Sequence, residues 1–250
     1  MFSPAEVAKN YINIGKGKAN QTTGKMFLLA ILAGMFIAMA GMAATFGNVY
    51  VNKVVGAAIF PAGLAMVLIA GSELFTGNCL LIIPLLEKEI TAAQMLRNWL
   101  IVYLGNMVGG LLVTAMAVFG GTFDGVYDAV IATAATKATL PFASALLRGI
   151  LCNVLVCLGV WMSFAAKSVG GKIAGLFFPV FVFVVCGFEH SIANMFYIPA
   201  GLMEAARFNA AADGLTVYGM LVRNLLPVTL GNIIGGCGVG AFYWGIYLKK

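Results

Sequence analysis

The chain is dominated by apolar stretches that are long enough to cross a lipid bilayer. Crossing an apolar layer about 30 Å thick takes about 20 helical residues. Four uninterrupted stretches reach that length, over residues 26–46, 99–119, 144–166 and 225–247. Two longer stretches, 54–86 and 173–203, are each interrupted near the middle by glycine, a charged residue and asparagine. The sequence therefore predicts an all-α integral membrane protein with six transmembrane helices, of which the second and fifth are broken.

The charged residues support this class and predict an orientation. Only 10% of the residues are charged, against about 25% in soluble domains. The first 25 residues are too polar for a secretory signal peptide. With both termini in the cytoplasm, ten lysines and arginines lie inside and three to five outside, as the positive-inside rule requires. The net charge of +6 is thereby explained without a nucleic-acid partner.

The reactive residues do not suggest a metal, a cofactor or an enzyme. All five cysteines fall in predicted spans and form no CxxC pair, so we interpret them as packing residues. The single histidine, His190, has no second histidine, cysteine pair or evident serine partner with which to build a metal site or a catalytic triad.

Residues 1–25 are predicted to hold an amphipathic cytoplasmic helix. Ser3, Pro4 and Glu6 form the pattern of a capping box with proline at the first helical position. We interpret this helix as an interfacial anchor, and a gating role is the alternative.

The chain contains an internal repeat. RNWLIVYLGNMVGG (97–110) matches RNLLPVTLGNIIGG (223–236) at an offset of 126, and GSELFTGN (71–78) matches GFEHSIAN (187–194) at an offset of 116. We predict two repeats, 26–120 and 144–247, joined by an extracytoplasmic loop over 121–143. Because each repeat holds three spans, the second enters the membrane inverted, and the two broken helices meet near the midplane.

Residues of the broken helices divide into structural and functional candidates. Glu73 and Glu189 occupy equivalent positions, as do Asn78 and Asn194, so we interpret all four as supports of the breaks. His190 aligns with Leu74 and is therefore not needed for a break. An ionisable group at membrane depth is a functional candidate, and the alternative is a buried neutral imidazole.

Small residues predict where helices pack closely. GNMVG (105–109) and GNIIG (231–235) have glycines four residues apart, which lets helix backbones approach in a bilayer. Asn106 and Asn232 within these motifs are expected to bridge helices by hydrogen bonds.

Four motifs together resemble the formate/nitrite transporter family: GFEHSIANMFYIPAG, GSELFTGN, LCNVLVCLGVWMS and NLLPVTLGNIIGG. The resemblance covers nearly the whole chain. It implies an aquaporin-like six-helix subunit, a homopentamer and one small-anion path through each subunit. It makes His190 the central histidine, Lys137 a vestibule lysine and Asn153 a path residue, and it places a flexible loop at Leu74, Phe75 and Thr76. The implied apolar constrictions are Phe60, Leu64, Leu74, Phe75, Val156 and Phe183. In FPAGL (60–64), Pro61 departs from the family pattern and is expected to adjust the helix locally.

The resemblance also implies a mechanism. Lys137 attracts small anions, and His190 donates a hydrogen bond to the anion or, when protonated, passes it a proton. Thr76, Asn153 and Ser191 supply neutral hydrogen bonds. The match to formate channels favours formate, with hydrosulfide and nitrite as alternatives and passive or proton-coupled flux left open. A neutral-solute pore of the aquaporin kind is a further alternative, although no asparagine-proline-alanine box occurs in the chain.

Overall fold

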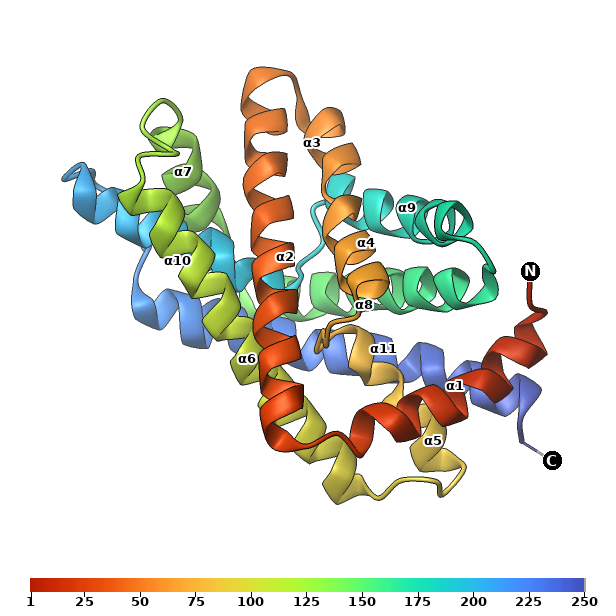
Figure 1. The fold of residues 1–250 in the computed structure, drawn as a ribbon. Helices are drawn as coiled ribbons and strands as arrows, with labels where there is room; N and C mark the ends of the chain where they lie inside the picture. The colour runs from red at the N-terminus through yellow and green to blue at the C-terminus, as the bar shows by residue number, and fades with distance from the viewer. Residues whose placement is uncertain (250) are drawn as a thin grey trace.

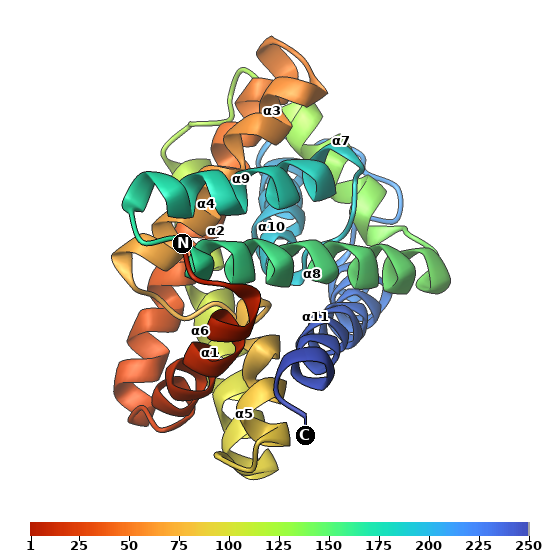
Figure 2. The same cartoon turned by 90° about the vertical axis from the view of Figure 1, so that its right-hand side faces the viewer.

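The computed structural model describes residues 1–249, which form helices and no strand. Figures 1 and 2 show the arrangement from two sides. In chain order the elements are α1 (Pro4–Ala19), α2 (Thr23–Tyr50), α3 (Lys53–Ile59), α4 (Pro61–Ala70), η1 (Gly77–Leu81), α5 (Ile82–Leu86), α6 (Ala92–Phe119), α7 (Tyr127–Ala138), α8 (Phe142–Ala165), α9 (Val169–Val185), α10 (Ser191–Arg207), η2 (Gly219–Leu225) and α11 (Leu226–Tyr247). The predicted all-helical membrane fold is confirmed.

Within residues 1–249, five helical segments are long and apolar enough to cross a bilayer. They are α2, α3 with α4 (Lys53–Ala70), α6, α8 and η2 with α11 (Gly219–Tyr247). Helix α9 is apolar but shorter. Helix α3 ends at Ile59 and α4 begins at Pro61, so the chain changes helix at the predicted adjustment.

Both broken stretches leave the helical conformation where the sequence places an interruption. Helix α4 ends at Ala70 and η1 begins at Gly77, while α9 ends at Val185 and α10 begins at Ser191. Gly71 (φ 81°) and Gly187 (φ 70°) adopt the left-handed conformation at repeat-equivalent positions. Glycine suits both positions because a side chain disfavours this conformation. Each glycine therefore turns the chain out of a helix near the middle of the molecule.

Two close helix pairs frame the breaks, α2 with α6 and α8 with α11. A Cβ atom on Gly109 would collide with the carbonyl oxygen of Ile31, and one on Gly235 with that of Ile150. The small-residue motifs therefore lie at the contacts that the sequence predicts.

Two amphipathic helices accompany the spans. Helix α1 begins with the predicted capping box of Ser3 and Glu6 and packs on α5, α6, η1 and α11. Helix α7 occupies the middle of residues 121–143, where the sequence predicts only a loop, and it packs on α10. In both views α1 lies beside the C-terminal part of α11 (Figures 1 and 2).

Candidate functional site

Three cavities follow one another between the broken helices. The α1 vestibule has a volume of about 410 Å³, and its lining includes Tyr11, Lys18, Gln21, Lys25 and Glu73. The α7 vestibule, of about 160 Å³, is lined by residues that include Thr45, Asn48, Thr133, Lys137 and Tyr197. A central cavity of only about 10 Å³ is lined by Ile37, Phe60, Leu64, Leu74, Val156, Val180, Phe183 and His190.

Shared lining residues show how the cavities connect. Phe60, Phe183 and His190 line both the α7 vestibule and the central cavity. Leu64 and Leu74 line both the α1 vestibule and the central cavity. The Phe60 and Phe183 rings meet edge to face, with centroids 5.7 Å apart. Two narrow apolar barriers therefore separate the small central cavity from the vestibules, and His190 lies at the barrier on the α7 side.

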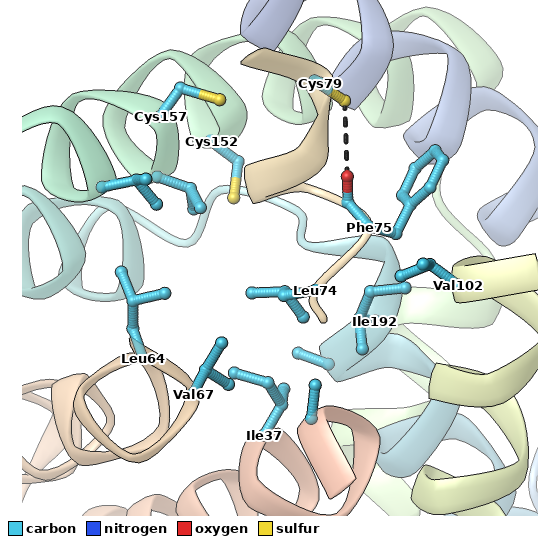
Figure 3. Close-up of a cluster of buried hydrophobic side chains, with 14 of the residues drawn as sticks. Ile37, Leu64, Val67, Leu74, Phe75, Cys79, Val102, Cys152, Cys157 and Ile192 are labelled. Carbon is cyan, nitrogen blue, oxygen red and sulfur yellow. Dashed lines mark hydrogen bonds between the residues drawn. The ribbon is translucent and has the colours of Figure 1, made fainter. Parts of the chain in front are cut away.

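Most of the predicted constriction residues line this central cavity. The exception is Phe75, whose ring packs edge-on against Trp99 and Tyr103. Figure 3 shows Leu64 and Leu74 pointing into a common space and Phe75 turned away from it. Ile37 and Val180 complete the lining. Sequence reasoning missed them because they look like any other apolar residue of a membrane span.

His190 links the two broken helices. It caps α10, and its Nδ1 accepts a hydrogen bond from the amide of Ala193 at 3.0 Å. Its Nε2 lies 2.9 Å from Oγ1 of Thr76. Because Nδ1 is an acceptor, a neutral ring carries its proton on Nε2 and donates it to Thr76. The ring also stacks on Phe183, with centroids 5.9 Å apart.

Asn106 and Asn232 stabilise the breaks in the same way. Asn106 accepts from the amide of Phe75 at 3.0 Å and donates to the carbonyls of Ala30 and Glu73 at 2.8 and 2.9 Å. Asn232 accepts from the amide of Ser191 at 2.9 Å and donates to the carbonyls of Gly149 and Glu189 at 2.8 and 3.0 Å. Each side chain thus satisfies two main-chain groups of a break, an amide and a carbonyl, and joins them to a carbonyl of a neighbouring helix, α2 or α8.

The glutamate of the first break forms a buried polar cluster with Lys18. Glu73 accepts from the Lys18 ammonium at 2.9 Å and from the Asn78 amide at 2.7 Å. Asn78 also donates to Asn98, which in turn donates to the main-chain carbonyl of Lys18 at 3.3 Å. Asn98 therefore orients the residue whose ammonium faces Glu73.

The second break repeats this cluster with Lys137. Glu189 accepts from the Lys137 ammonium at 2.9 Å and from the Asn194 amide at 2.6 Å. Asn194 donates to Asn224, and Asn224 donates to the main-chain carbonyl of Lys137 at 2.9 Å. These four contacts recur in both clusters, as expected of repeats, while each glutamate accepts one further bond of its own, Glu73 from Gln21 at 3.1 Å and Glu189 from Asn224 at 3.3 Å.

Lys18 was not singled out by sequence reasoning, although it corresponds to Lys137. One signal was available, since each lysine lies five residues before the first residue of the next helix, α2 or α8. Both ammonium groups are ion-paired, and the side chains of Lys18 and Lys137 are only 19% and 16% exposed. The lysine beside each break is therefore a paired cation, whereas Lys25, which also lines the α1 vestibule, has no ion pair within residues 1–249.

Asn153 and Ser191 lie beside the path without lining any of the three cavities. The Asn153 amide donates to the carbonyls of Thr76 and Asn232, at 3.1 and 2.6 Å. Asn153 Oδ1 and Ser191 Oγ are buried without a hydrogen-bond partner in the described chain. Among the polar residues expected along the path, only His190 and Lys137 line one of the three cavities. Thr76 lines none of them, and its side chain contacts His190, which does.

The sequence is similar to those of known channels and transporters. The sequence profile of the family described as Formate/nitrite transporter matches residues 5–245. A probable formate transporter from Methanothermobacter thermautotrophicus is 39% identical, over 99% of this chain and 98% of the relative. The formate channel FocA of Escherichia coli K12 is 40% identical, over 100% of this chain and 96% of the relative.

Two solved structures are also similar. A pentameric formate channel with formate bound has a TM-score of 0.78 at 35% identity, covering 91% of this chain and 98% of the other. An FNT family ion channel has a TM-score of 0.84 at 31% identity, covering 97% of this chain and 98% of the other.

Proposed function

The chain belongs to the formate/nitrite transporter family, and from that membership we propose that it conducts small monovalent weak-acid anions, formate first among them. Its relatives are channels and transporters, not enzymes. The observation that carries the proposal is the central cavity of about 10 Å³ between two apolar barriers, with His190 at one of them. That volume has room for about one water molecule, so a solute larger than that passes only when the lining side chains move apart, which favours the smallest solutes.

The apolar barriers decide in what form a solute crosses. Moving a small ion from water into an apolar medium has an idealised cost on the order of 20 kcal/mol. A carboxylic acid with a pKa near 4 is neutral to about one part in a thousand at pH 7. The solute therefore crosses as the rare neutral acid or as an anion that receives hydrogen bonds inside the barrier.

His190 acts, in this proposal, as a neutral hydrogen-bond donor. A second proton on the ring would have to go on Nδ1, which accepts from Ala193 in the cap of α10. The Nε2 proton is already directed at Thr76. An incoming anion replaces Thr76 as its acceptor, and a proton that neutralises the anion comes from solution rather than from His190.

The vestibules receive anions through their lysines. Lys18 and Lys137 each share their charge with one glutamate, so an anion competes with that carboxylate for the ammonium group. In this proposal the protein lies in the cytoplasmic membrane with both termini in the cytoplasm. The α1 vestibule then opens to the cytoplasm, and the α7 vestibule opens to the opposite side of the membrane. Five subunits assemble into a homopentamer with one path in each, as the similarity to a pentameric formate channel suggests.

Uptake by proteoliposomes tests the proposal. Formate, nitrite, hydrosulfide and chloride are compared at pH 5, 6 and 7 in the unaltered protein and in His190→Asn. Weak-acid anions should enter faster than chloride, and His190→Asn should change their order or their pH dependence. Equal flux of all four anions without an effect of the variant would contradict the proposal. Preference for nitrite or hydrosulfide would reassign the substrate, and fast water flux without anion flux would favour a neutral-solute pore.

A further inference from the structure

Three cysteine thiols converge on one loop beside the path. We call residues 75–79 the loop; they carry Thr76 and run from the end of the first break into the first residues of η1. Cys79 Sγ donates to the carbonyl of Phe75 at 3.6 Å, Cys157 Sγ to that of Thr76 at 3.4 Å, and Cys237 Sγ to that of Cys79 at 3.5 Å. Figure 3 shows Cys79 and Cys157 next to the segment that carries Leu74 and Phe75.

These thiols are not a requirement of a broken helix. The repeat offset of 116 places Met195 at the position of Cys79, and the offset of 126 places Leu111 at that of Cys237. The second break is stabilised by Asn232 without a thiol donor from residues 1–249. Packing alone, the role that the sequence suggested for the cysteines, does not explain three thiols on one loop.

The thiols also lie close to one another. The Cys237 thiol lies directly against Cys79, because its sulfur atom is 3.5 Å from the carbonyl oxygen of that residue. A Cβ atom on Gly236 would lie 2.6 Å from Cys79 Cβ and 3.0 Å from Cys157 Sγ, so glycine leaves room for the sulfur atoms. Cys79 and Cys157 are fully buried, whereas Cys237 is partly exposed. A small reagent therefore reaches the cluster first at Cys237.

The number and type of donor atoms in the cluster determine which kind of metal ion it can bind. The described residues contain no group of three histidine, cysteine or acidic side chains arranged to hold a metal ion. The four-coordinate geometry of a structural zinc site is thus not provided. Two adjacent thiols instead suit a soft ion that binds thiolates strongly and accepts two ligands.

We propose that Cys79 and Cys237 form a binding site for a soft, thiol-seeking metal ion such as Hg(II), and that its occupation closes the solute path. When HgCl₂ binds, two S–H and two Hg–Cl bonds break, two S–Hg bonds form, and two protons and two chloride ions leave to solvent, with no change of oxidation state. Both sulfur atoms then release the carbonyls of Phe75 and Cys79, and the loop shifts. Because Leu74 precedes this loop and lines the 10 Å³ cavity, a small shift is enough to close it.

The test combines a metal count with a transport assay, because the second part of the proposal rests on the proposed function. Reduced protein in liposomes receives HgCl₂ at one equivalent per chain, and bound mercury is measured after removal of the excess. Cys237→Ala and Cys79→Ala are compared with Cys186→Ser and Cys152→Ala, which remove thiols without a hydrogen bond to the loop within residues 1–249. Each variant's formate uptake is normalised to its own rate without metal.

We expect tight binding of one ion per chain in the unaltered protein and both controls, with uptake reduced about tenfold and restored by dithiothreitol. Cys237→Ala and Cys79→Ala should lose both the bound ion and the inhibition. Equal mercury binding by all variants would overturn the site, and binding at the pair with unchanged uptake would overturn the closure. If no anion is transported at all, the proposed function fails while the metal count still decides the site.

Discussion

Asn106 and Asn232 each form hydrogen bonds with three main-chain groups. These groups lie inside the membrane, where no water is present to replace a lost hydrogen bond. The same side chain accepts one amide and donates to two carbonyls, which only an amide side chain can do. The sequence located both asparagines inside helix-packing motifs. The structure adds their contacts, since each asparagine pairs an amide and a carbonyl of a break and ties them to a neighbouring helix.

Replacing Asn232 by alanine should destabilise the protein by at least about 2 kcal/mol. Three hydrogen bonds at the modest value typical of membrane proteins, about 0.6 kcal/mol each, already give that amount, and unpaired buried groups add to it. Unfolding in detergent measures the loss. Asn10→Ala, at an exposed position of α1, is the matched control and should leave stability unchanged. Equal stability of both variants would show that Asn232 does not support the break.

Removing Lys137 should leave the carboxylate of Glu189 buried without its cation, since that side chain is only 5% exposed. Breaking a buried pair costs about 3–5 kcal/mol, and the partial exposure of Lys137 places Lys137→Ala at the lower end. Adding Glu189→Gln should recover part of the loss. Lys25→Ala removes an exposed lysine that lines the α1 vestibule without an ion pair in residues 1–249, and it should be neutral in thermal unfolding. A double variant less stable than Lys137→Ala would contradict this account.

At the scale of helices, the two close pairs α2–α6 and α8–α11 frame the breaks and so position the residues that line the path. Gly235 faces the backbone of α8, and a methyl group there has only main-chain atoms of Ile150 to displace. Gly238 lies on the same helix, and nothing is found within 4 Å of a Cβ atom built on it. A comparison of substitutions at Gly235 and Gly238 therefore measures how much close helix packing contributes to stability.

Gly235→Ala should force α11 away from α8 and destabilise the protein by about 3 kcal/mol, the upper part of the range for overpacking, because backbone does not move aside like a side chain. Gly238→Ala should be neutral or gain up to about 1 kcal/mol from helix propensity. Thermal unfolding of the two variants in one detergent measures the difference. Similar unfolding temperatures would mean that the helices are not held at this contact.

The first turn of α1 should be sensitive to acid. The amide and hydroxyl of Ser3 donate to Glu6 and lower the pKa of its carboxyl below the ordinary value of 4.5. The stabilisation from the capping box is therefore complete above pH 4.5 and is lost as the pH falls through the lowered pKa. Hydrogen exchange of the first-turn amides should accelerate over that interval in the unaltered protein. Glu6→Gln should remove this pH dependence, and its persistence in that variant would assign it to another group.

The sequence predicted most of these elements because their signals are local. Span length located α2, α6, α8 and α11, and Ser3 with Glu6 located the start of α1. Helix α7 was missed because a short amphipathic helix in a polar loop carries no comparable signal. Lys18 was missed because its role depends on Glu73, which lies 55 residues further along the chain. The roles assigned to Thr76, Asn153 and Ser191 along the path stay predictions.

At the scale of the whole molecule, the candidate path is built from both halves. Thr76 belongs to the first and His190 to the second, and their side chains meet at 2.9 Å. The cavity between the barriers likewise takes Leu64 and Leu74 from one half and Val156 and Phe183 from the other. Neither half contains a complete path.

The assembled protein should have a mass of about five subunits of 26.2 kDa each. A pentamer fits because many large apolar side chains, such as Leu100, Leu147 and Phe242, are exposed on the single chain and need lipid or a neighbour. Native mass spectrometry after gentle removal of detergent measures the mass. A single species at the mass of one chain, retaining anion uptake in liposomes, would contradict the pentamer.

The contact of Asn153 and Cys157 with the carbonyl of Thr76 has a consequence for how the protein is made. Ribosomes complete the first three spans before α8 exists. Until α8 has entered the bilayer, the loop at residues 75–79 lacks two of the donors that hold it. A nascent chain stopped at residue 120 would therefore carry an incomplete loop at membrane depth, and insertion of the fourth span is the step in biogenesis that completes it.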